Sequence, residues 1–112
     1  MTIKTVSDFK KALQIGVMLH CTHHQKSIGR DEKGYTIYAS VDMGVRPVSI
    51  KQSNSFALKT VRTDGKEVDS WCSYPKASQC IIKDNAVTIL EEDCRVREDI
   101  RPLIPILTYT FI

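Results

Sequence analysis

The densest group of chemically capable side chains is the run His20-Cys21-Thr22-His23-His24. We expect this run to be extended, and alternate residues of a strand project from the same face. Cys21 and His23 therefore point to one side of the strand, while His20 and His24 point to the other. A thiolate and an imidazole on one face are two of the four ligands that a structural zinc ion takes. The run predicts half of a zinc site.

The other half of that site is predicted from two cysteines that flank a turn. Cys72 and Cys80 lie on either side of residues 74–79, where Pro75 interrupts the strand pattern. Antiparallel pairing across this turn would bring the two thiols side by side. The predicted structural zinc ligands are Cys21, His23, Cys72 and Cys80, with His24 and Cys94 as alternatives. The paired Cys-x2-Cys spacing of common zinc sites is absent, so inert core cysteines are the competing interpretation.

The cellular compartment decides how the cysteines are interpreted. The first five residues lack the basic-then-apolar pattern of a secretory signal, and no apolar stretch approaches the roughly 20 residues of a membrane span. We therefore expect a cytoplasmic protein without a membrane partner. In a reducing compartment the four cysteines are free thiols or metal ligands more often than disulfides.

Catalysis has little support in the sequence. No Gly-rich phosphate loop, no Ser–His–acid pattern and no paired-carboxylate motif is present. Cys21 with a neighbouring histidine resembles a nucleophile and its base, but such pairs are assembled in space, so adjacency along the chain says little. We expect a binding function and no enzymatic activity.

Nucleic-acid binding is one such function. A sheet can stack bases on aromatic side chains and follow phosphates with basic ones. The candidates are Tyr35, Tyr38, Phe56, Trp71 and Tyr74 for stacking, with Lys51, Lys59, Arg62 and Lys76 for phosphates. The net charge of +3 and aromatic content of 7% are low for this role, and most of these aromatics are also expected in the core. Trp71, between two polar neighbours, is expected to pack beneath the sheet.

The 112 residues fit one domain, 1–112, with a single helix near its start. Thr5 and Asp8 have the types and spacing of a helix cap. Phe9 and Leu13 then fall on one helical face, and Gly16 is a natural stop. A helix this short survives by packing on a sheet.

The remaining residues have strand lengths and strand compositions. The expected strands cover residues 17–24, 35–41, 48–52, 56–62, 68–74, 80–83, 86–91 and 106–112. Residues 26–34 and 91–101 are expected to be polar connections, and the last strand to start late or lie at an edge because of its prolines. Asp64-Gly65 and Asp84-Asn85 predict tight hairpins. The fold class is mainly β (α+β), an antiparallel meander or a partly open barrel with one short N-terminal helix.

Two parts of the chain resemble a known group of proteins. Phe56-Ala57-Leu58-Lys59-Thr60, Asp64-Gly65 and the segment Ser70-Trp71-Cys72-Ser73-Tyr74-Pro75-Lys76-Ala77-Ser78 are similar to small phage and prophage proteins of Gram-positive bacteria. The opening, Ala12 to Gly16 followed by Leu19-His20-Cys21, fits the same group. Proteins of this kind include anti-CRISPR inhibitors of the type II CRISPR–Cas effector nuclease, some of which bind zinc.

The resemblance implies an inhibitor that acts in the host bacterial cell by docking on the nuclease and blocking its motion or its nucleic-acid loading. A charge of +3 excludes an acidic mimic of DNA. Residues 1–56 hold eight basic and four acidic side chains, and we expect contacts with acidic protein surface there. The basic candidates are Lys10, Lys11, Lys26, Arg30 and Lys33. The alternative is a small nucleic-acid-binding β-barrel that acts in phage regulation or replication.

Overall fold

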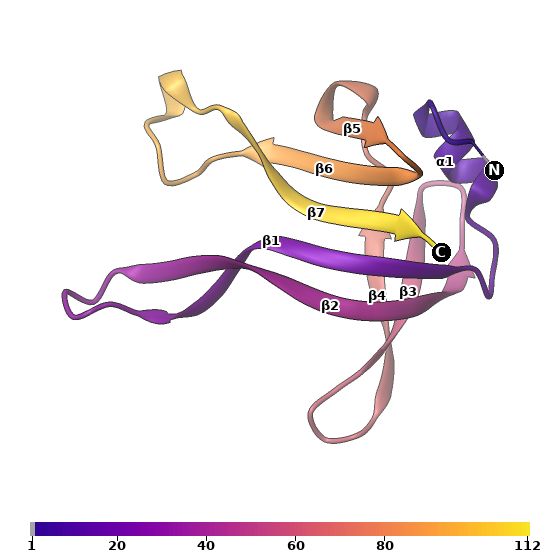
Figure 1. The fold of residues 1–112 in the computed structure, drawn as a ribbon, viewed down its shortest axis with the longest axis horizontal. Coiled ribbons are helices and arrows are strands. Elements are labelled where there is room, and N and C mark those ends of the chain that lie inside the picture. The colour runs from indigo at the N-terminus through magenta and orange to yellow at the C-terminus, as the bar shows by residue number, and fades with distance from the viewer. Residues whose placement is uncertain (1) are drawn as a thin grey trace.

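The chain folds into a seven-stranded antiparallel sheet with a short helix at one end (Figure 1). The computed structural model describes residues 2–112, so Met1 lies outside the described residues. The strand order is β4-β3-β2-β1-β7-β6-β5. The helix is α1 (Val6–Ala12), and the strands are β1 (Met18–Arg30), β2 (Thr36–Lys51), β3 (Ser55–Val61), β4 (Glu67–Ser73), β5 (Cys80–Lys83), β6 (Ala86–Glu92) and β7 (Leu103–Phe111). The predicted mainly β fold with one N-terminal helix is confirmed.

The helix begins at the predicted cap. The Thr5 hydroxyl accepts the Asp8 amide at 3.1 Å, and the Asp8 carboxylate accepts the Lys4 amide at 3.1 Å and the Thr5 amide at 3.2 Å. These hydrogen bonds hold the pKa of the Asp8 carboxyl below its ordinary value of 3.8, and the bond from the Lys4 amide has the largest effect. No helix among residues 2–112 is long and apolar enough to cross a membrane.

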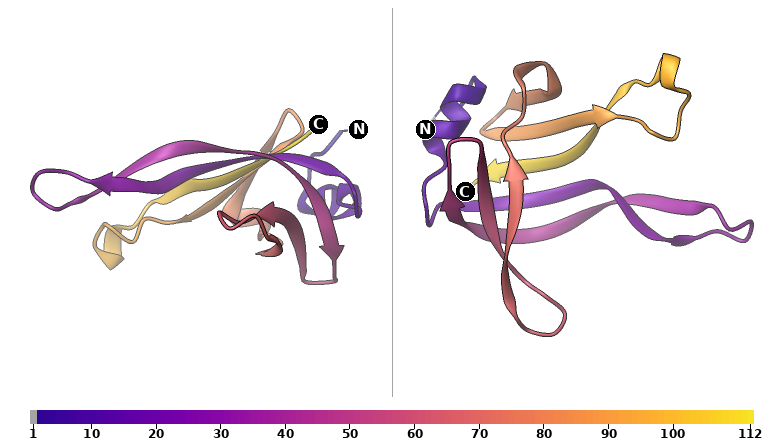
Figure 2. Two further views of the ribbon diagram at one scale, coloured as in Figure 1. Left: turned by 90° about the horizontal axis from the view of Figure 1, so that it is seen from below. Right: turned by 180° about the vertical axis from the view of Figure 1, so that it is seen from behind.

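β2 is one long strand where the sequence predicted two, at 35–41 and 48–52. Between the two predicted strands, Gly44 sits in a β-bulge opposite Cys21, with φ at +80°. The Asp42 carboxylate accepts a hydrogen bond from the Gly44 amide at 2.7 Å, so this amide of the bulge has a side-chain partner two residues away. Residues 36–47 pair with β1, and Val48–Lys51 pair with β3. The bend between these parts turns β3 and β4 across the other strands (Figure 2).

β1 is also longer than predicted, because most of the expected polar loop at 26–34 is strand. β1 continues to Arg30, and only residues 31–35 form the turn. The Asp31 carboxylate accepts the amides of Lys33 and Tyr35, each at 2.9 Å. β7 pairs with β1 only from Leu19 to His23. Residues 24–40 therefore form a two-stranded hairpin, here called the arm, which projects from the sheet (Figure 1).

The two predicted tight hairpins are confirmed. β3 and β4 are joined around Asp64-Gly65, where Gly65 has a φ of +84°. β5 and β6 are joined by Asp84 and Asn85, with φ values of +52° and +61°. Two successive positive φ values match the strand twist in a tight hairpin.

β7 starts at Leu103, earlier than the predicted 106, and lies between β1 and β6 in the strand order. Pro105 is tolerated because β1 pairs with β7 only over residues 107–111, so the proline has no partner on that side. Near its prolines β7 is therefore locally an edge, as the sequence predicted.

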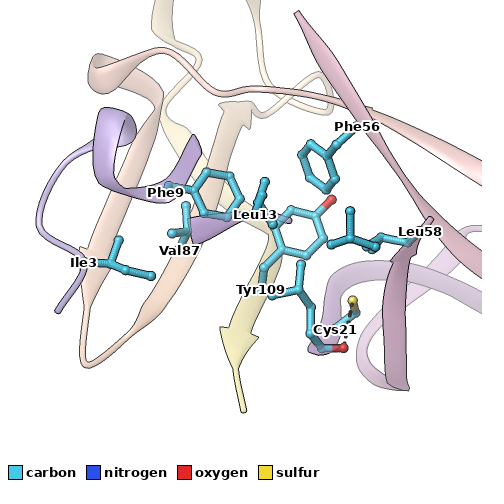
Figure 3. Packing of buried hydrophobic residues seen from close by; sticks show 10 residues of the cluster. Ile3, Phe9, Leu13, Cys21, Phe56, Leu58, Val87 and Tyr109 are labelled. Carbon is cyan, nitrogen blue, oxygen red and sulfur yellow. Dashed lines mark hydrogen bonds between the residues drawn. The ribbon is translucent and has the colours of Figure 1, made fainter. Parts of the chain in front are cut away.

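The core lies where β3 and β4 cross β7 beneath the helix (Figure 3). The Phe9 ring of α1 packs against the rings of Phe56 and Tyr109, at centroid distances of 6.0 and 6.3 Å. Phe56 from β3 also meets Tyr109 from β7 at 5.8 Å, although these strands are not neighbours in the sheet. The sheet is therefore curled into a partly open barrel, and α1 covers one end.

Candidate binding surfaces

The structure does not gather the four predicted zinc ligands. Cys72 and Cys80 are not paired, because β4 pairs with β3 and β5 pairs with β6. The predicted pairing across residues 74–79 is therefore wrong: hairpins form on either side of that segment. Among residues 2–112, no three His, Cys, Asp or Glu side chains are arranged to hold a metal ion. Zinc binding stays a prediction without geometric support, which a metal assay on untagged protein tests.

Two of these cysteines surround a buried tyrosine. The Tyr109 hydroxyl donates to Cys72 Sγ at 3.3 Å, and Cys21 lies opposite Tyr109 in the β1–β7 ladder. Burial raises the pKa of the Cys21 thiol to about 11, and nearby Cys72 adds to this rise. Burial also raises the pKa values of Cys72 and Tyr109. All three groups are neutral at pH 7, and they behave as core side chains.

The three histidines lie on two faces of β1, as the alternation predicted. His20 Nε2 contacts the Asp42 carboxylate at 2.7 Å on the outer face. On the same face, His24 Nε2 lies 2.6 Å from the Thr108 hydroxyl, and Thr108 lies 2.9 Å from the Thr88 hydroxyl. His23 is half-buried on the inner face, where its Nδ1 has no hydrogen-bond partner among the described residues and burial lowers its pKa.

The predicted base-stacking residues do not form one platform. Phe56 is fully buried, and Tyr74 packs against it at 5.4 Å. Trp71 is 52% exposed, so the prediction that it packs beneath the sheet is wrong: it alternates with Cys72, and Cys72 takes the inward position. Of the predicted phosphate contacts, Lys59 pairs with Asp69 at 2.9 Å, and Arg62 pairs with Asp64 at 3.1 Å. Lys51 Nζ donates to the Lys10 carbonyl at 2.6 Å.

The arm exposes apolar side chains on a structure with little packing of its own. Four large hydrophobic residues are at least 41% exposed there: Ile28, Tyr35, Ile37 and Tyr38. The Arg95 guanidinium, in the connection between β6 and β7, lies over the Tyr38 ring at 4.9 Å from its centroid. This cation–π contact joins the connection to the arm near its base. The sequence did carry a signal for this hairpin, since β-forming residues flank a short polar turn that contains Gly34.

A second surface is a cleft of about 370 Å³ between the end of β4 and the β6–β7 pair. One wall is the segment Trp71–Lys76, in which Lys76 is exposed. Ile89 and Leu107 form much of the opposite wall, and Tyr109, which also lines the cleft, donates a hydrogen bond to Cys72 of the first wall. The cleft is apolar inside and charged at its rim, which is typical of a ligand or peptide site.

Comparison with known proteins gives no indication of function, so a functional proposal rests on these two surfaces. No protein-family model, curated protein or solved structure matches the chain. The resemblance to phage proteins therefore rests on the sequence segments alone. One of those segments, Ser70 to Ser78, contains the β4 wall of the cleft.

Proposed function

We propose that this protein is a protein-binding domain that docks through its arm and inhibits a bacterial defence nuclease, the type II CRISPR effector. The observation that carries the proposal is the exposed apolar set on the arm, residues 24–40. Tyr35 is 69% exposed and Ile28 is 57% exposed, on a hairpin that no third strand covers. Large apolar side chains that remain exposed on one projecting element favour a protein-binding role.

The energetics of the arm favour a bound partner. A two-stranded hairpin is marginally stable in water, and this one gains no core of its own. Moving one large apolar side chain from water into a partner's pocket contributes roughly 1.5–3 kcal/mol. Tyr35 and Ile37 together therefore supply enough binding energy to act as anchors.

The charges on the arm set the character of the partner surface. Lys26 and Lys33 are exposed, as is Arg30, whose guanidinium donates to the Gly34 carbonyl at 3.1 Å. The Asp31 carboxylate at the tip already accepts two backbone amides. An apolar groove with an acidic rim is the complementary surface, and opposite charge there speeds association. These are three of the five basic residues that the sequence predicted for such contacts.

The choice of a nuclease as the partner comes from the resemblance to phage proteins. A chain with net charge +3 lacks the strongly acidic composition of a DNA mimic, so docking on the protein is the route to inhibition. Nucleic-acid binding is less well supported, because Phe56 is buried and the Lys59 and Arg62 side chains are already in ion pairs.

A binding and cleavage assay with a purified type II effector and its guide RNA tests this proposal. We expect the protein to bind the effector and inhibit DNA cleavage, and the Tyr35→Ser/Ile37→Ser variant to bind at least about tenfold more weakly. The matched control is Val61→Ser/Ile81→Ser, which removes two similarly exposed apolar side chains, 64% and 55% exposed, outside the arm. This control should bind and inhibit like the wild type.

Two results would overturn the proposal. One is equal loss of binding in the arm variant and the control, which would remove the arm from the interface. The other is binding to nucleic acid alone that falls steeply with rising salt, because counterion release gives phosphate contacts that dependence.

A further inference from the structure

A second interaction surface lies at the free edge of β4. β4 pairs with β3 along its whole length and with no other strand of residues 2–112. Its outer edge therefore presents backbone amides and carbonyls without a strand partner, over the seven residues Glu67–Ser73. This edge contains no proline and no bulge, which are common devices that protect an exposed edge from pairing.

The space beside this edge is backed by the other layer of the barrel. β3 and β4 run crosswise over β1 and β7, the layer that they form ends at β4, and β6 and β7 continue beyond it (Figure 2, right). The cleft opens at that point, with Leu107 and Ile89 of the backing strands on its far wall. Both residues are only half-buried, so this part of the inner face is incompletely covered. A further strand beside β4 would cover it.

We propose that this slot binds an extended segment of a partner protein, which adds to β4 as an eighth strand. The backbone of the segment pairs with β4, and its side chains alternate between the two faces. Side chains on one face enter the cleft over Leu107 and Ile89 and are apolar. Those on the other face lie beside Trp71, which is 52% exposed at the outer side of the same edge.

A second copy of this chain does not fit the slot. Two β4 strands paired edge to edge around a two-fold axis would place both backing layers on the same side of the sheet. The backing strands β6 and β7 already extend past the edge of β4 (Figure 2, right), and residues of both line the cleft. The equivalent strands of the second copy would occupy that same space. A lone extended segment, which carries no backing layer, has no such clash.

The inference does not depend on the arm or on the identity of the nuclease. The arm, residues 24–40, contributes none of the residues that line this cleft. Failure of arm docking and failure of strand addition at β4 are therefore separate results.

Selection from a phage-displayed library of random nonapeptides, followed by NMR titration of the best synthetic peptide, tests the inference. We expect selected peptides with apolar residues at alternate positions. On binding, the amide signals of residues 67–73 and the Trp71 indole signal should shift, and hydrogen exchange in β4 should slow. Trp71→Ala should weaken binding about tenfold. The Tyr35→Ser/Ile37→Ser arm variant should bind the peptide like the wild type.

Any of four outcomes would overturn the inference. The selection enriches no peptide over an unrelated control protein. The shifts fall outside β4 and the cleft. A version of the peptide with alternate backbone amides N-methylated, made in both registers, binds as well as the original, which would show that no backbone pairing occurs. Dimerisation through β4, detected by sedimentation, would contradict the choice of a partner segment.

Discussion

The body and the arm are built from the same two strands but are stabilised in different ways. In the body, β1 has strand partners on both sides over Leu19–His23, and Leu19 and Cys21 are buried. In the arm, β1 pairs only with β2, and its residues 26–30 are all exposed. The body is therefore held by tertiary packing, whereas the arm is held by its backbone ladder and by the Asp31 turn. The body therefore supplies most of the folding stability, whereas the arm carries the proposed binding contacts.

The largest effect is expected from removing an aromatic ring of the body. Phe56 is fully buried and contacts the rings of Phe9, Tyr74 and Tyr109. Phe56→Ala should lower the free energy of unfolding by about 3–5 kcal/mol, through lost apolar burial and a residual cavity. Urea denaturation followed by circular dichroism measures this loss. A change below about 1 kcal/mol would show that the body is not packed around this ring.

The second effect is a loss of stability at alkaline pH that comes from the body alone. The ordinary thiol pKa is 9.0, and burial raises the pKa of Cys21 to about 11 in the folded chain. Between these values the unfolded chain releases the thiol proton and the folded chain keeps it. The free energy of unfolding should therefore fall as pH rises, by roughly 2–3 kcal/mol across the window.

Cys21→Ala isolates this contribution. Burial also raises the pKa values of Cys72 and Tyr109, so the wild-type slope contains several groups, and the difference between the two slopes belongs to Cys21. Urea unfolding at pH 8 and pH 10.5 gives both slopes. Identical slopes for the wild type and the variant would refute the assignment.

The smallest effect is expected from polar substitutions in the arm. Tyr35 and Ile37 are 69% and 41% exposed, so their side chains lose little packing when they are replaced. Tyr35→Ser/Ile37→Ser should change the free energy of unfolding by no more than about 0.5 kcal/mol, in the same urea assay as Phe56→Ala. Destabilisation comparable with that of Phe56→Ala would mean that the arm is part of the cooperative core.

The sequence predicted the elements whose signals are local. The Thr5–Asp8 cap and the turns at Asp64-Gly65 and Asp84-Asn85 are set by a few neighbouring residues, and all three were predicted correctly. In β4 the structure buries Cys72 more than Trp71, since the exposure of the strand alternates. Trp71 was predicted to be buried because its two neighbours were taken as polar, but one of them, Cys72, holds the inward position.

The features that were missed depend on contacts between distant residues. The polar composition of residues 26–34 suggested a loop. A two-stranded arm, however, pairs its backbone amides and carbonyls between its own strands and needs no apolar face. Cys72 and Cys80 were paired in the prediction because they are close in sequence. Strand order instead depends on which apolar strand faces pack against one another in the core. In this sheet β7, the last strand of the chain, lies between β1 and β6. No local signal for that arrangement exists in the chain.

Hydrogen–deuterium exchange of the protein with and without a purified type II effector complex tests the central claim most directly. In the free protein, amides of residues 26–39 should exchange much faster than those of the body strands, since local opening of the arm breaks no core contacts. On binding, exchange in the arm should slow markedly and exchange in the body strands should change little. Unchanged arm exchange in a formed complex would contradict the account.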